Sequence, residues 1–188
     1  MDNNEKTYLL VDGENIDATL GMSVLNRRPH PDERPRWDRI LAYAQSRFGR
    51  DVRALFYLNS SSGQLPISFV QALIAMDYRP LPLAGTTSQK VVDIGIQRTL
   101  EAIAERGPAH VLLASHDGDF IPQVHTLLDN GSRVGVLCFR EFLNAELASL
   151  TDDGLEIYDL ESEVHAFQVA LPRVKIIPLE DFHPEEFL

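Results

Sequence analysis

Four aspartates lie where predicted strands or loops meet the next element, and their side chains together could bind a divalent cation. Asp12 ends one apolar run, and Asp117 and Asp119 follow another. Asp93 lies at the start of a long helical pattern. In an open α/β sheet, the loops at the carboxyl ends of the strands meet in one crevice. Carboxylates gathered there repel one another unless a cation is shared, so the pattern favours a site for a hard divalent metal.

Such a site would suit phosphodiester hydrolysis, which needs an activated water and a group that offsets charge on the phosphate oxygens. A bound divalent ion supplies both. Mg²⁺ favours carboxylates and retained waters, which suits a site with no obvious cysteine or histidine ligand. We expect Asp12, Asp93 and Asp117 to be direct or water-bridged ligands. Asp119 is then a further ligand or the base that orients the attacking water.

Each aspartate also has a structural interpretation. Asp119 precedes a helical pattern at residues 120–129, where it could cap free backbone N–H groups. Asp93 could serve the helix macrodipole alone, and Asp12 could be a buried strand residue with a polar partner. Glu14 is more typical of a solvated loop acid than of a ligand. The sequence leaves these alternatives open.

The elements that must position these side chains alternate between strand and helix. Apolar periodicity predicts strands at residues 7–11, 52–58, 110–114, 133–139 and 155–160. It predicts helices at residues 37–48, 67–76, 91–106, 120–129 and 144–150, with a loop at residues 26–36. Residues 79–83 carry two prolines and favour an edge strand or an extended connection. The alternation predicts an α/β fold with βαβ units and a mostly parallel sheet.

Three short segments, at residues 11–15, 90–93 and 115–120, carry a resemblance to a known family. Taken together and in this order on an α/β pattern, they resemble the NYN domain family, in the LabA-like branch of the PIN-like nucleases. The resemblance covers residues 8 to 139, about 70% of the chain. It implies a Rossmann-like α/β/α sandwich with a mostly parallel central sheet, an acidic site for Mg²⁺ or Mn²⁺, and RNA cleavage.

The resemblance also implies that all four aspartates are catalytic metal ligands. Asp12 matches the first-strand aspartate of the family, and Asp93 matches the acid that follows the family's lysine. Asp117 and Asp119 match the paired acids after the fourth strand.

Four neighbouring residues match positions that would support the site or contact the substrate. Asn15 matches the asparagine that supports the first aspartate or contacts the substrate, and Ser115 the small polar residue before the paired acids. Lys90 matches the family's lysine, which could pair with a substrate phosphate or only offset the carboxylates. His116 departs from the family, where many relatives carry glycine, and its imidazole could narrow the site or contact the phosphate.

Length and composition favour one soluble domain at residues 1–160, followed by an acidic extension at residues 161–188. The 188 residues are 44% hydrophobic and 24% charged, as is ordinary for a globular protein. No apolar run approaches the roughly 18 residues that span a bilayer, and the polar start of the chain shows no signal-peptide pattern. Cys138 is the only cysteine, which fits a reducing compartment. We therefore expect a cytoplasmic protein without a membrane partner.

The charge is negative overall but unevenly spread. A net charge of −11 argues against a broad electrostatic grip on nucleic acid. Residues 27–53 nevertheless hold eight arginines against four acids, either as a candidate RNA-backbone patch or as the solvated face of a helix. Residues 152–188 hold ten acids against two bases. Within them, residues 169–178 favour a further strand, and residues 180–188 are either a solvated tail or a segment docked on the domain or on a protein partner.

The sequence therefore leads to one main hypothesis, a metal-dependent ribonuclease that hydrolyses phosphodiester bonds of single-stranded or structured RNA. The alternative is a catalytically weak NYN-fold regulatory or protein- or RNA-binding module, suggested by the acidic end, and a homo-oligomer is also left open. Phosphoryl transfer of the haloacid dehalogenase or receiver kind fits poorly. Its nucleophile needs a second acid adjacent or two residues on, and Asp12 is followed only by Glu14. No glycine-rich phosphate loop follows the first strand either.

Overall fold

The computed structural model describes residues 6–86 and 88–188. The polar start of the chain at residues 1–5, and Thr87 of the polar loop at residues 85–89, lie outside the described residues. Over the described residues, six strands form one sheet in the order β3-β2-β1-β4-β5-β6, and every neighbouring pair is parallel. The strands are β1 (Thr7–Asp12), β2 (Val52–Asn59), β3 (Arg79–Leu83), β4 (His110–Ala114), β5 (Arg133–Cys138) and β6 (Glu156–Asp159).

The central strands are the apolar runs of the sequence, because a parallel sheet covered on both faces buries its strands completely. All six residues of β1 are buried. The strand β3 lies at one edge, which accommodates Pro80 and Pro82, since a proline has no N–H to offer to a central ladder. Of the two alternatives predicted for residues 79–83, an edge strand or an extended connection, the structure shows the edge strand.

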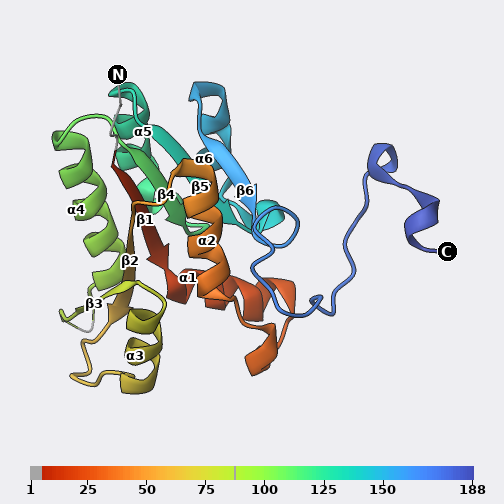
Figure 1. The fold of residues 1–188 in the computed structure, drawn as a ribbon, viewed down its shortest axis with the longest axis horizontal. Helices are drawn as coiled ribbons and strands as arrows, with labels where there is room; N and C mark the ends of the chain where they lie inside the picture. Colours follow the sequence, from red (N-terminus) through yellow and green to blue (C-terminus); the bar gives the residue numbers. More distant parts are fainter. Residues whose placement is uncertain (1–5, 87) are drawn as a thin grey trace.

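Over the described residues, three α-helices cover each face of the sheet (Figure 1). One face carries α1 (Gly13–Thr19), α2 (Trp37–Phe48) and α3 (Ile67–Ala75), and the other carries α4 (Val91–Glu105), α5 (Ile121–Asp129) and α6 (Ala145–Ser149). Alternate residues of β1 divide between the two cores: Leu9 and Val11 pack with the first set of helices, and Leu10 packs with the second. The Rossmann-like α/β/α sandwich is therefore confirmed.

Short helical turns complete the fold. A π-helical turn, Leu20–Val24, continues α1. The remaining turns are 3₁₀ helices at Pro31–Glu33, Gly118–Phe120, Arg140–Phe142, Leu150–Asp153, Leu179–Asp181 and Pro184–Glu186. The sequence did not predict the helix at residues 13–24, whereas its other helices match the structure to within one or two residues at each end.

The strand order reverses between β1 and β4, which are neighbours in the sheet but far apart in the chain. In open α/β sheets the crevice outside the carboxyl ends of the strands at this switch point is the usual ligand site. Asp12 ends β1, and residues 115–119 follow β4. The topology therefore brings the predicted site residues to one place.

The chain does not leave the domain after β6. Val164, Ala166 and Leu171 are buried in the same core as α2. The guanidinium of Arg39, on α2, donates hydrogen bonds to the backbone carbonyls of His165 and Phe167. Residues 161–171 therefore pack as part of the domain.

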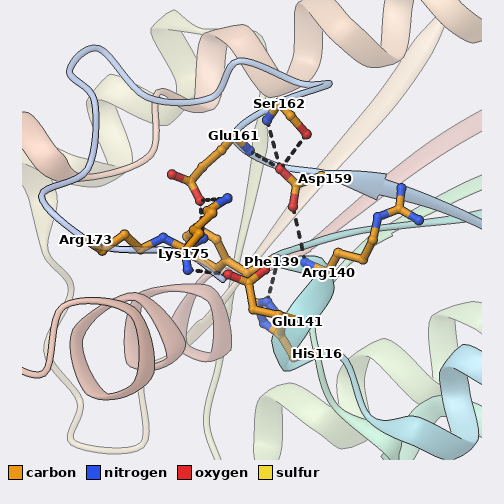
Figure 2. A network of polar contacts seen from close by, with 9 residues as sticks. All are labelled: His116, Phe139, Arg140, Glu141, Asp159, Glu161, Ser162, Arg173 and Lys175. Carbon is orange, nitrogen blue, oxygen red and sulfur yellow. Dashed lines mark hydrogen bonds and ion pairs between the residues drawn. The ribbon is translucent and has the colours of Figure 1, made fainter. Parts of the chain in front are cut away.

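Arg173 fixes the end of this packed segment (Figure 2). Its side chain is 9% exposed, forms ion pairs with Glu141 and Glu161, and lies over the ring of Phe139. A nearly buried guanidinium is stabilised only when carboxylates accompany it, and here two do so. Lys175 adds a further ion pair with Glu161, at 2.8 Å.

Beyond the ion pairs of Arg173 and Lys175, residues 176–188 extend away from the sheet (Figure 1). Val174 and Ile176 are 100% and 98% exposed, and Phe182 and Phe187 stack on each other. The prediction of a strand at residues 169–178 is wrong: the segment joins no sheet, and Arg173 holds it by side-chain ion pairs instead.

Candidate metal centre

Three carboxylates meet at the carboxyl ends of β1 and β4. Asp93, Asp117 and Asp119 each offer one oxygen, and these oxygens lie within 4.8 Å of one another. Asp93 is in the first turn of α4, and Asp117 caps the 3₁₀ turn Gly118–Phe120 by accepting a hydrogen bond from the N–H of Asp119 at 2.9 Å. We call these three residues the acidic cluster.

Lys90 supplies the positive charge nearest to the acidic cluster. Its Nζ lies 2.9 Å from Oδ2 of Asp119 and 3.6 Å from Oδ2 of Asp93. The hydrogen bond to Asp119 raises the pKa of Lys90. Burial, together with the charge of Asp117, raises the pKa of the Asp93 carboxyl. Because the Lys90 side chain is 69% exposed, it can move aside for a metal ion or a phosphate without repacking the core.

Asp12 lies outside the acidic cluster and borders it through Ser115. The residue is 2% exposed, and its carboxylate accepts a hydrogen bond from the backbone N–H of Asn15 at 3.3 Å and one from Ser115 Oγ at 3.0 Å. The same Ser115 oxygen accepts a hydrogen bond from the N–H of Asp117 at 3.2 Å. Burial, opposed by these hydrogen bonds and aided by the charges of Asp93 and Asp117, raises the pKa of Asp12 to about 7.

His116 lies next to Asn15 and holds its side chain in place. Its Nε2 accepts a hydrogen bond from the N–H of Phe139 at 2.8 Å, so the ring proton is on Nδ1, which donates to Oδ1 of Asn15 at 2.9 Å. The same Asn15 oxygen accepts the backbone N–H of His116 at 2.8 Å, and the imidazole stacks on the ring of Phe139. Burial lowers the pKa of His116 to about 4. Both ring nitrogens are therefore occupied within the protein, and the ring is neutral at pH 7.

The capping role that the sequence left open for Asp119 belongs to Asp117. The carboxylate of Asp119 contacts Lys90, and Asp117 provides the cap of the turn that precedes α5. Asp12 caps α1 in addition to its contact with Ser115. Glu14 is exposed. Hence Asp12 and Asp117 have both a capping role and a place at the site.

The arginines at residues 27–53 are mostly engaged within the protein. Arg27 pairs with the buried Glu33, Arg34 with Asp17, and Arg36 with Asp38, while Arg39 binds backbone carbonyls. These contacts favour a structural role for this stretch over the RNA-backbone patch.

One residue of the site carries no signal in the sequence. Gln97, one turn beyond Asp93 on α4, donates a hydrogen bond from Nε2 to the backbone carbonyl of Asp119 at 2.9 Å. This contact ties the turn that holds Asp117 and Asp119 to the helix that holds Asp93. It depends on the packing of two elements far apart in the chain, which no local pattern reports.

The donor set of the acidic cluster fits a hard divalent cation. All its ligating atoms are carboxylate oxygens, which Mg²⁺ and Mn²⁺ prefer. Two oxygens on opposite sides of a Mg²⁺ ion are about 4.2 Å apart, close to the 4.8 Å within which the three oxygens lie. The net negative charge of the cluster exceeds what Lys90 can offset, so a shared cation would stabilise it.

Comparison with known proteins shows the family and the fold. The family model for the NYN domain matches residues 6–157. A search of curated proteins gives no significant match. Among solved structures, a protein of unknown function from Vibrio parahaemolyticus superimposes with a TM-score of 0.66 at 20% sequence identity, over 86% of this chain and 96% of that one. At this identity the likeness supports the fold alone.

Over the described residues, no helix has the length and apolar character needed to cross a membrane.

Proposed function

Because the chain belongs to the NYN domain family, which has a PIN-like fold, we propose that it is a metal-dependent ribonuclease of the LabA-like branch. The observation that carries the proposal is the acidic cluster: three carboxylates within 4.8 Å of one another at the switch point of the sheet. The substrate would be single-stranded or structured RNA, and the reaction the hydrolysis of a phosphodiester bond.

In this proposal Asp93, Asp117 and Asp119 hold Mg²⁺ or Mn²⁺, with Asp12 as a water-bridged neighbour. The bound ion would lower the pKa of a water molecule and offset charge on the phosphate oxygens. The water oxygen bonds to phosphorus, the bond from phosphorus to the leaving ribose oxygen breaks, the water's proton passes to a carboxylate, and the leaving oxygen takes up a proton from solvent. Asp12 suits the role of the carboxylate that takes the water's proton, since it borders the acidic cluster through Ser115 and is not itself one of the three residues that hold the ion.

The other side chains orient these groups. Lys90 lies at the exposed side of the acidic cluster, where its ammonium group can pair with a phosphate oxygen. Ser115 joins Asp12 to the backbone of Asp117. His116 fixes the side chain of Asn15 through its ring Nδ1 and backbone N–H, so we assign His116 a positioning role rather than a phosphate contact.

The test is cleavage of labelled RNA, single-stranded and hairpin, by purified protein with Mg²⁺ or Mn²⁺ and then with excess EDTA. We expect cleavage that EDTA abolishes and that Asp117→Asn and Asp12→Asn reduce by two orders of magnitude or more. The matched control is Asp152→Asn, at an exposed aspartate far along the chain from the site. Cleavage that persists unchanged in both site variants would come from a contaminant and would overturn the proposal.

A second candidate is a catalytically weak binding module. It is favoured by the exposed apolar side chains of Val174, Ile176 and Leu179, next to Glu180 and Asp181, in a segment that leaves the domain. Such a segment fits a protein partner or a second copy of the chain. Light scattering of the full chain and of a variant shortened after Lys175 measures self-association. The module is preferred if the protein binds Mn²⁺ without turnover and the shortened variant loses a binding partner.

A further inference from the structure

A groove runs beside the metal centre, along the line where α4 packs against β2 and β3. It consists of two adjoining hollows that share Leu81, Arg98 and Thr99. The first hollow begins at Gln89 and Val91, on either side of Lys90. The second continues toward the far end of α4. We call the two together the α4–β3 groove.

Four arginines line the second hollow: Arg53 on β2, Arg79 on β3, Arg98 on α4 and Arg106 directly after α4. All four are exposed. In the part of the chain that the structure describes, no ion pair or side-chain hydrogen bond engages any of these guanidiniums. In a protein with a net charge of −11, four unpaired cations in one hollow mark a surface that an anionic ligand would stabilise.

The floor of the hollow is apolar, formed by Leu55, Leu81 and Ile103. Among the described residues, no carboxylate lines the hollow. The tyrosines that contribute to the groove, Tyr8 and Tyr57, are 5% and 1% exposed and offer no free ring for base stacking. A ligand would therefore be held by its charge and would contact the floor with apolar edges.

The close approach of α4 to the sheet is set by Gly95. A β-carbon at this position would lie 2.3 Å from Cδ1 of Leu83, so a larger residue would require the Leu83 side chain or the helix to shift. The glycine stands in the middle of a helix, where it lowers helix stability by about 1 kcal/mol relative to alanine. This packing keeps Arg98, one turn further along, against β3.

The groove leads directly from the metal centre. Lys90, at its mouth, contacts Asp119 of the acidic cluster. The 15 residues of α4 span about 22 Å, which holds at most about six nucleotides at the per-strand spacing of about 3.4 Å in a helix. A strand whose scissile phosphate lies at the acidic cluster could therefore run its backbone past Arg98 to Arg106.

We infer that the α4–β3 groove binds the sugar–phosphate backbone of single-stranded RNA on one side of the cleaved bond. The inference rests on the proposed ribonuclease function and extends it by naming where the substrate lies. Contacts between guanidiniums and phosphates do not distinguish one base from another, so the binding does not depend on the RNA sequence. It is also sensitive to salt, because each phosphate contact releases counterions.

The test measures RNA affinity separately from cleavage. Fluorescence anisotropy with a labelled 12-nucleotide RNA, in Mg²⁺, uses the Asp117→Asn protein so that the RNA stays intact. We expect the double substitution Arg79→Glu/Arg98→Glu to weaken binding at least tenfold and to reduce the salt slope by one to two. The matched control is Arg50→Glu, at an exposed and unpaired arginine outside the groove, with less than a twofold effect.

The outcomes separate the two proposals. If the wild-type protein cleaves RNA and Arg79→Glu/Arg98→Glu binds RNA as tightly as its parent, the groove inference fails and the ribonuclease stands. If the wild-type protein does not cleave but the double variant still loses RNA affinity, the groove stands and the ribonuclease fails. If the double variant changes only the self-association of the protein, the occupant is an acidic protein segment and the inference is overturned. Arg79→Gln/Arg98→Gln replaces the charge reversal if the latter unfolds the protein.

Discussion

The buried carboxylate of Asp12 should make the stability of the metal-free protein depend on pH, and Asp12→Asn tests this. Burial raises the pKa of Asp12 from 3.8 to about 7. Between these values the folded state holds a proton that the unfolded state has released. The free energy of unfolding therefore falls as the pH rises from about 4 to about 7, and it levels off above that range.

The size of the effect follows from the shift in pKa. Each pKa unit corresponds to about 1.4 kcal/mol. Relative to low pH, the titration of Asp12 therefore lowers the free energy of unfolding by about 4 kcal/mol at pH 8 and by about 1.5 kcal/mol at pH 5, where the folded protein still holds the proton. Asparagine has the same shape, its oxygen can still accept the N–H of Asn15, and the hydroxyl of Ser115 can rotate to accept from its amide. We expect Asp12→Asn to gain stability relative to the wild type, with the gain larger by about 3 kcal/mol at pH 8 than at pH 5.

The assay is urea denaturation in EDTA at several values between pH 5 and pH 8, followed by circular dichroism. The exposed Asp152→Asn serves as the control and should show no such trend. An equal change in unfolding free energy at pH 5 and pH 8, or a loss at pH 8, would refute the argument that Asp12 is ionised at a cost. Added Mg²⁺ should stabilise the wild type at pH 8 more than it stabilises Asp12→Asn, because the ion offsets the charge that asparagine lacks.

Three further predictions concern two residues at the candidate site, His116 and Lys90, and Arg173, which holds the C-terminal segment. His116→Phe should lower the free energy of unfolding at pH 7 by about 2–4 kcal/mol, measured in urea, because it leaves the Phe139 N–H without its buried acceptor and removes one of the two hydrogen bonds to the Asn15 side-chain oxygen; a change below 0.5 kcal/mol would contradict this. Lys90→Met should tighten Mn²⁺ binding several-fold in titration calorimetry while lowering RNA cleavage, since the ammonium no longer competes for the acidic cluster; weaker Mn²⁺ binding would count against the cluster as the metal site. Arg173→Met should make residues 161–188 more sensitive to limited proteolysis, because two glutamates lose their shared partner, and an unchanged digestion pattern would show that the apolar contacts alone hold the segment.

Much of the fold could be predicted from the sequence because its signals are local. The strands at the centre of the sheet are uninterrupted apolar runs, and the two prolines of β3 restrict it to an edge. Strands that alternate with amphipathic helices leave a parallel sheet as the simple arrangement. These patterns need no knowledge of tertiary contacts, and the structure confirms them.

The helix α1 was missed because its first residue resembles a turn. Gly13 follows Asp12, and the pair is typical of a loop after a strand. In the structure Gly13 begins the helix, and a β-carbon there would lie 2.5 Å from the ring of Phe56. The glycine therefore allows α1 to pack closely against Phe56 and does not mark a turn. Ile16, Leu20 and Val24, at steps of four, were the helical signal.

The candidate metal centre was predictable at the level of residue types but not of geometry. Strand-end positions indicated that the four aspartates would lie near one another. The sequence could not show that Asp12 bonds to Ser115 while Asp119 joins Asp93 and Asp117, because this division depends on side-chain directions. The support that His116 gives to Asn15 likewise requires the backbone of a different strand, and spacing along the chain does not encode it.

The negative charge of the protein is compatible with RNA binding once its distribution is considered. Residues 152–188 hold ten of the 28 acids and two of the 17 bases, so residues 1–151 hold 18 acids and 15 bases. Without the four aspartates of the site, whose charge a metal would largely offset, this part of the chain has a net charge of +1. Most of its cations outside the α4–β3 groove already have carboxylate partners, whereas the four arginines of the groove do not. For a single strand, four phosphate contacts give a salt slope of about −3. A slope near that value would show that local unpaired charge, rather than net charge, governs the affinity of this protein for RNA.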